Sequence, residues 1–172
     1  NPLLDHQRFA ILADRRLVGV DLEGDDQTVP RQVDFTQIDM LIEKLVGAVV
    51  AFADAPNLAQ AARVSAMGLF RNSGQVCVAG SRLLVQRDIH DEFVQAVVQV
   101  AQQLRVGHPL SVDTDIGAIS SARQLERVKA MLARAEQQGA QRLCGGASLE
   151  PVPGGFYMQP TVVAGVTADM DI

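Results

Sequence analysis

The sequence has only two cysteines, Cys77 and Cys144, among its 172 residues. Two cysteines do not make a disulfide framework, so we expect a reducing compartment, and the cytoplasm is the simplest one. No apolar run approaches the roughly 18 residues of a membrane-spanning helix, so no membrane span is predicted. The first six residues also lack the basic start and the apolar core of a signal peptide.

Positive charge is scarce too. The chain has 15 lysines and arginines against 20 aspartates and glutamates, and its formal net charge is −5. This balance offers no basic footprint for nucleic acid or for an anionic membrane, so neither is an expected partner. The sequence contains no G-x-G-x-x-G stretch, no repeat and no low-complexity tract. A hydrophobic content of 48% and a charged content of 20% are typical of a soluble globular domain.

Candidate metal ligands occur in one place only. Four acids, Asp21, Glu23, Asp25 and Asp26, lie close together and could bind a divalent cation. They lack the Asp-x-Asp-x-Asp-Gly spacing of a calcium loop, so a solvated turn is the preferred interpretation. We therefore predict no metal site.

Two histidines could be considered as bases. His108 lies between Gly107 and Pro109, in a stretch that the two flanking residues mark as a loop. His90 falls near the start of a predicted helix, where a surface position is expected. Loop and surface roles are the preferred interpretations of both side chains.

Residues 1–47 form a segment to which we assign no known fold. Apolar runs at residues 9–12 and 17–22 flank a polar turn and predict a hairpin. Asp34 is expected to cap a helix that begins at Phe35 and carries one apolar stripe.

From residue 48 onward, strands and helices alternate. This order predicts an α/β fold with a mainly parallel sheet and flanking helices. Asn57, Asp88 and either Ser120 or Ser121 are the expected helix N-caps. The predicted strands are residues 48–52, 81–86, 141–144 and 156–166, the last interrupted by Pro160, and the predicted helices are residues 57–70, 88–105 and 120–138.

Cys77 is the residue whose surroundings suit chemistry. It follows a polar loop, Asn72 to Gln75, and precedes the small residues Ala79 and Gly80. A thiol reacts as the thiolate, which requires partial access and nearby hydrogen-bond donors, and a loop between a helix and a strand can offer both. The alternative is a small buried cysteine that fills core space.

The order of residues around Cys77 resembles a known family. The stretch Asn72-Ser73-Gly74-Gln75-Val76-Cys77-Val78-Ala79-Gly80-Ser81-Arg82 is similar to the catalytic-cysteine signature of the NAD(P)-dependent aldehyde dehydrogenases. Further stretches of that family follow in the same order. They are residues 49–55, 115–120, 139–140, 144–146, 155–162 and 169–172. The resemblance covers residues 48–172 and implies a partial aldehyde dehydrogenase-like catalytic domain.

The resemblance also implies a mechanism. In the family, the cysteine attacks an aldehyde to give a thiohemiacetal, hydride passes to NAD or NADP, and water hydrolyses the thioester to a carboxylic acid. Cys77 matches the nucleophile, and its backbone amide matches one oxyanion donor. The implied small-molecule partner is an aldehyde.

Other parts of the family pattern find no match in these 172 residues. The Leu-Glu-Leu-Gly-Gly stretch that holds the general base is absent; Lys44 to Gly47 stands in its place, and the neighbours of Glu43 do not match. The Phe-Thr-Gly-Ser cofactor loop is absent as well. We therefore expect a truncated oxidoreductase that is inactive on its own. The alternative is a non-enzymatic α/β fold remnant. In either case, apolar faces left uncovered predict a homo-oligomer.

Overall fold

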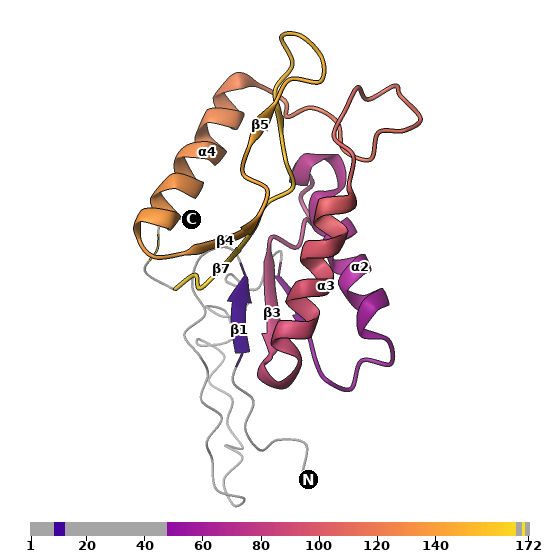
Figure 1. The fold of residues 1–172 in the computed structure, drawn as a ribbon, viewed down its shortest axis with the longest axis vertical. Helices are drawn as coiled ribbons and strands as arrows, with labels where there is room; N and C mark the ends of the chain where they lie inside the picture. The colour runs from indigo at the N-terminus through magenta and orange to yellow at the C-terminus, as the bar shows by residue number, and fades with distance from the viewer. Residues whose placement is uncertain (1–8, 13–47, 168–169, 171–172) are drawn as a thin grey trace, which may run out of the picture.

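The computed structural model describes residues 9–12, 48–167 and 170 (Figure 1). Several sequence-based predictions fall outside these residues: the second hairpin strand at 17–22, the acidic cluster at 21–26, the helix from Phe35, and Glu43. The described part of the chain has no helix of the length and apolarity needed to span a membrane.

Strand β3 (Arg82–Gln86) is the centre of a three-stranded sheet in the order β1-β3-β2. Strand β2 (Ala48–Ala51) pairs with β3 in parallel, with Val49 opposite Leu83. Strand β1 (Phe9–Leu12) pairs with the other edge of β3 in the antiparallel sense, with Phe9 opposite Gln86. A central strand can be apolar on both faces, and residues 83–85 are accordingly all buried.

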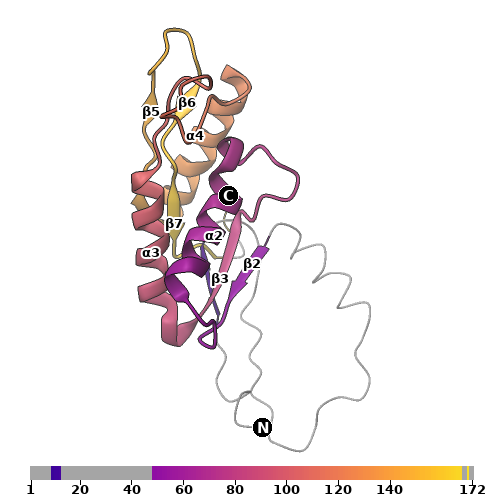
Figure 2. The same cartoon turned by 90° about the vertical axis from the view of Figure 1, so that its right-hand side faces the viewer.

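Two helices cover this sheet. Helices α2 (Leu58–Phe70) and α3 (His90–Gln103) lie side by side and pack against β3 (Figures 1 and 2). Ala62 on α2 and Phe93 on α3 are fully buried in this shared core. The small residues of α2 allow a close approach of the two helices, and the aromatic ring of Phe93 contributes much of the buried apolar area.

The ends of these helices confirm one predicted cap and correct another. The side chain of Asn57 accepts a hydrogen bond from the Gln60 amide at 2.9 Å and caps α2, as predicted. The prediction that Asp88 caps the next helix is wrong. Asp88 lies in a 3-10 turn, η2 (Arg87–Ile89), where its carboxylate accepts from the Gln86 side chain at 3.3 Å, and α3 begins one turn later at His90. The turn continues directly out of β3, which leaves Asp88 too early to reach the helix amides.

A second hydrophobic cluster lies around α4 (Ala122–Gln137). Ser121 caps this helix by accepting from the Gln124 amide at 3.2 Å, and Gly139 follows its end with φ +102°. Of the two predicted caps, Ser121 is therefore the one used. The buried face of α4 packs against residues of the C-terminal strands; the cluster contains Ile119, Leu125, Leu132, Ala135, Ala140, Met158, Val163, Val166 and Met170.

The remaining strands form two antiparallel pairs. Strand β4 (Gln141–Cys144) pairs with β7 (Val162–Ala164), and the two-residue strands β5 (Ser148–Leu149) and β6 (Tyr157–Met158) pair with each other. The predicted extended segment 156–166 is thus divided by Pro160, as expected. The β4–β7 pair lies between α4 and α3, and the β5–β6 pair lies beside α4 (Figures 1 and 2). The α/β class and the flanking helices are confirmed, and the parallel pairing is that of β2 with β3.

Candidate nucleophile loop

The backbone between α2 and Cys77 has an unusual conformation. The short turn η1 (Arg71–Gly74) contains three consecutive residues with positive φ: Asn72 at 52°, Ser73 at 57° and Gly74 at 73°. Glycine adopts this left-handed region freely and asparagine tolerates it, but it is costly for serine. Such a turn persists only where surrounding contacts hold it.

The turn is closed by bonds between Asn72 and Gln75. The Asn72 carbonyl accepts from the Gln75 amide at 3.0 Å and from the Gln75 side-chain nitrogen at 3.1 Å. In return, the Asn72 side-chain nitrogen donates to the Gln75 carbonyl at 3.1 Å. These local bonds are side-chain-to-backbone contacts of the kind that stabilise asparagine in tight turns.

The turn is also tied to a segment more than 40 residues later in the chain. The Ser73 hydroxyl donates to the Gly117 carbonyl at 2.8 Å. The Gln75 side-chain oxygen accepts from the Ser120 amide at 2.8 Å, and its nitrogen lies 3.4 Å from the Ala118 carbonyl. The loop before Cys77 and the segment before α4 therefore form one hydrogen-bonded frame.

The partner segment is itself anchored at its start. Asp115 accepts from the backbone amide of Arg105 at 2.9 Å and from its guanidinium at 3.2 Å, and the guanidinium also reaches Asp113 at 3.1 Å. These bonds hold the pKa of Asp115 below its usual range, with the Arg105 backbone amide as the largest cause. A bridge between Val106 and Ile116 closes the same loop.

Cys77 lies just beyond this frame and is exposed. Its neighbours Val76 and Val78 are also exposed, Val78 by 79%. Cys77 lies within a short turn in which the Ala79 amide donates to the Val76 carbonyl at 3.0 Å, and a second turn follows, in which the Ser81 amide donates to the Ala79 carbonyl at 2.9 Å. The thiol is thus accessible between two supported ends of the loop, and Cys77 does not fill core space.

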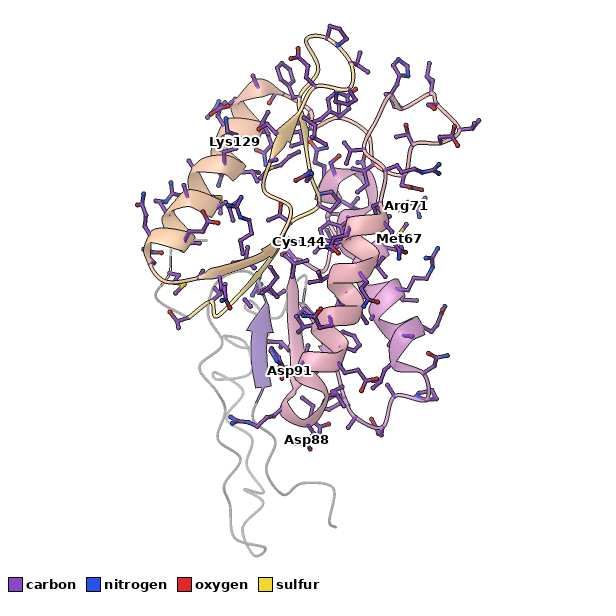
Figure 3. All side chains as sticks on the ribbon, viewed as in Figure 1. Met67, Arg71, Asp88, Asp91, Lys129 and Cys144 are labelled. Atoms are coloured by element: carbon purple, nitrogen blue, oxygen red, sulfur yellow. The ribbon has the colours of Figure 1, made fainter. Side chains whose placement is uncertain are left out.

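Cys144 has the opposite surroundings. It ends β4, is 9% exposed, and belongs to the core that α2, α3 and β3 share. Burial raises the pKa of the Cys144 thiol, although a backbone hydrogen bond from Val162 acts in the other direction. In the view of Figure 3, Cys144 lies on the side of the β4–β7 pair that faces α3, while Arg71, just after α2, lies across α3 from it.

A cleft of about 280 Å³ opens beside Cys144, not beside Cys77. Gln102 and Leu104 at the end of α3 contribute to one side of it, and Gln159 and Pro160 to another. None of its lining residues comes from the stretch 70–82. The cleft therefore does not belong to the candidate nucleophile loop.

The two candidate histidines lie where the sequence places them, one in a loop and one at the start of a helix. His108 is exposed in its loop, where its Nδ1 accepts from the Leu110 amide at 3.1 Å, and His90 pairs with Asp91 at 2.8 Å. Over residues 48–167, no three histidine, cysteine or carboxylate side chains gather in a way that could hold a metal ion.

Sequence reasoning selected residues 72–75 as a polar loop and missed what they bind. Ser73 and Gln75 bond to residues 117–120, and no local sequence pattern predicts a contact between residues more than 40 positions apart. The available signal was indirect, because both stretches belong to the same family resemblance.

Comparisons with known proteins agree with that resemblance. A model of the aldehyde dehydrogenase family matches residues 46–172. The chain is 41% identical over 108 residues to a betaine aldehyde dehydrogenase of Mesorhizobium japonicum, an alignment that covers 62% of this chain and 22% of the relative.

Solved structures match at the level of the fold as well. An indole-3-acetaldehyde dehydrogenase crystallised with NAD+ aligns with a TM-score of 0.67 and 38% identity, over 70% of this chain and 24% of that one. An NAD-dependent aldehyde dehydrogenase from Sinorhizobium meliloti aligns with a TM-score of 0.68 and 34% identity, over 78% and 28% of the two chains. The chain thus spans about a quarter of the length of the proteins that it matches.

Proposed function

The chain belongs to the aldehyde dehydrogenase family, and from that membership we propose that it contributes the nucleophile, Cys77, to the NAD(P)-dependent oxidation of an aldehyde to a carboxylic acid. The observation that carries this proposal is the exposed thiol of Cys77 beside a hydrogen-bonded loop, at the position of the family's signature. Residues 48–172 are the proposed extent of the catalytic part, with residues 1–47 as a separate segment.

The step proposed for Cys77 is addition to the carbonyl group. The thiolate sulfur forms a bond to the aldehyde carbon, and the π electron pair of the carbonyl moves to its oxygen, which becomes an alkoxide. The backbone amide of Cys77 is the proposed donor to that oxygen. The exposure of the loop lets a substrate reach the sulfur, and the frame at residues 72–75 limits the positions that the sulfur can take.

The described residues do not form a site that fits NAD or NADP. The sequence has no G-x-G-x-x-G stretch, and the cleft beside Cys144 is lined without any residue of the nucleophile loop. We therefore derive no step through the cofactor. For the 172-residue chain alone, the prediction stays that simple aldehydes give no NADH or NADPH above a Cys77→Ala control.

The nucleophile assignment is tested by thiol labelling. Iodoacetamide at neutral pH, followed by peptide mapping, should alkylate Cys77 on the order of 100-fold faster than Cys144, because Cys144 reacts only after local opening of the core. Acylation by p-nitrophenyl acetate should also occur at Cys77 and disappear in Cys77→Ala but persist in Cys144→Ala. Preferential labelling of Cys144, or acylation that survives Cys77→Ala, would contradict the proposal.

A second role, self-association, is supported by a different observation. Val50 and Phe52 are exposed by 42% and 39% at the end of β2, and β2 is an edge strand of the described sheet. Apolar side chains along a strand edge favour association with a second chain. We propose a homo-oligomer, and light scattering at micromolar concentration tests it: a monomer mass unchanged by dilution would contradict it.

The compartment is proposed on the state of the two thiols. Both cysteines are free in the structure, which suits a reducing compartment, and the cytoplasm remains the proposed location. Fractionation of the source cells with an antibody to this chain would check it, and recovery in an oxidising compartment would contradict it.

A further inference from the structure

The polar residues before Cys77 differ in how they are bonded. Ser73 makes one bond out of the turn, to Gly117, while the carboxamide of Gln75 bonds on both of its atoms. Its oxygen accepts from Ser120, and its nitrogen is shared between the carbonyls of Ala118 and Asn72. Gln75 is thus the side chain that makes two of the three side-chain bonds between residues 72–75 and the segment before α4, and Ser73 makes the third.

The location of Gln75 gives these bonds a direct consequence. It is two residues from Cys77, and it follows three residues held at positive φ. Without an external tie, residues of that kind relax toward ordinary backbone conformations, and the chain that follows them moves. The position of the Cys77 sulfur therefore depends on the bonds that hold residues 72–75.

We infer that Gln75 is a positioning residue: its carboxamide braces the turn at 72–74 against residues 118–120 and so sets where the Cys77 thiol is presented. The role of this brace in catalysis rests on the proposed function of Cys77. The brace itself rests only on the hydrogen bonds of Gln75. The hydrogen bonds of the Gln75 carboxamide go to backbone groups, so Gln75 acts on Cys77 through the loop.

Gln75→Met tests the brace, because methionine keeps the length of the side chain and removes both polar atoms. Gln99→Met, at an exposed position on α3, is the matched control. Hydrogen exchange resolved to the Ser120 amide should become about fivefold faster in Gln75→Met, as expected for one lost hydrogen bond, and should not change in Gln99→Met. Unchanged exchange at Ser120 would overturn the inference.

Two thiol reagents distinguish a loss of Cys77 positioning from a general loosening of the fold. Acylation of Cys77 by p-nitrophenyl acetate needs a defined approach and should fall about tenfold or more in Gln75→Met. Alkylation by iodoacetamide needs only an exposed thiol and should stay within about twofold. Cys144 should stay unlabelled, since its labelling would report a loosened core instead. Equal losses with both reagents, or no loss of acylation, would overturn the positioning role.

Gln75→Glu is a second variant, which keeps an acceptor and removes the donors. A carboxylate keeps an acceptor for the Ser120 amide and loses the donors to Ala118 and Asn72, so exchange at Ser120 should stay slow while acylation falls. Acylation at the unsubstituted rate would overturn the role given to those donors. If the unsubstituted chain is not acylated at Cys77 at all, the nucleophile assignment fails, and Ser120 exchange in Gln75→Met still decides the brace.

Discussion

The thiols of the two cysteines lie in opposite surroundings. Cys77 is exposed in a loop that is held by hydrogen bonds, and Cys144 is buried at the end of a strand that is held by packing. The first arrangement leaves the sulfur accessible and limits its movement, while the second removes it from solvent and raises its pKa. We therefore expect the surroundings of each cysteine to decide how reactive its thiol is, and a cysteine count cannot distinguish the two.

The difference between the thiols should be abolished by opening the core. Phe93→Ala removes a fully buried ring between α3 and the sheet, and it should lower the free energy of unfolding by about 3–5 kcal/mol. Cys144 should then be alkylated at a rate approaching that of Cys77. Chemical denaturation and peptide mapping measure both effects.

Val64→Ala is the control for that experiment, because Val64 is 60% exposed on α2. It should leave both stability and Cys144 protection nearly unchanged. Equal destabilisation by the two substitutions would show that α3 does not depend on Phe93 for its packing.

A smaller effect is expected from the glycine beside Cys144. Gly145 has φ +73°, and an added Cβ would collide with the Pro160 carbonyl, so Gly145→Ala should separate β4 from the chain before β7. Gly154 has φ +75° with open space around it, so Gly154→Ala shares the backbone strain without the collision. We expect Gly154→Ala to cost about 1 kcal/mol and Gly145→Ala at least twice as much, with faster labelling of Cys144 only in Gly145→Ala.

Alkaline pH should lower the stability of the folded chain through the buried thiol of Cys144. Because burial raises the folded-state pKa of Cys144, its contribution to stability is fully present below the unfolded pKa of about 8.5. That contribution is lost as pH rises through the higher folded value. Denaturation series between pH 7 and 10 should show a steeper loss for the unsubstituted chain than for Cys144→Ala, and parallel losses would contradict the assignment.

The smallest effect is expected from Asp115, which anchors the segment that bonds to the loop before Cys77. The pKa of Asp115 is lowered by the amide and guanidinium of Arg105, so its contribution is present above the unfolded pKa of about 3.9 and is lost as pH falls through the lower folded value. Asp115→Asn should reduce the acid sensitivity of unfolding slightly, since both partners are solvent-exposed. Asp54→Asn, at an exposed site, is the control, and equal shifts in the two variants would contradict a specific role.

Much of the secondary structure follows from local chemistry. The spacing of apolar residues, together with the caps Asn57 and Ser121, predicted α2 and α4 closely, because a cap bond spans only three residues. The same reasoning failed at Asp88, where the 3-10 turn continuing from β3 determined where the helix begins.

The candidate site divides in the same way. Sequence alone determined that Cys77 follows a polar loop rich in hydrogen-bonding side chains, and the order of those residues identified the family. Only the tertiary structure decided that Gln75 bonds to Ser120 and that the turn at 72–74 is left-handed. The reason is physical: a contact between residues 45 positions apart depends on how α3 and the loop that follows it return the chain to the same place, and no local propensity encodes that return.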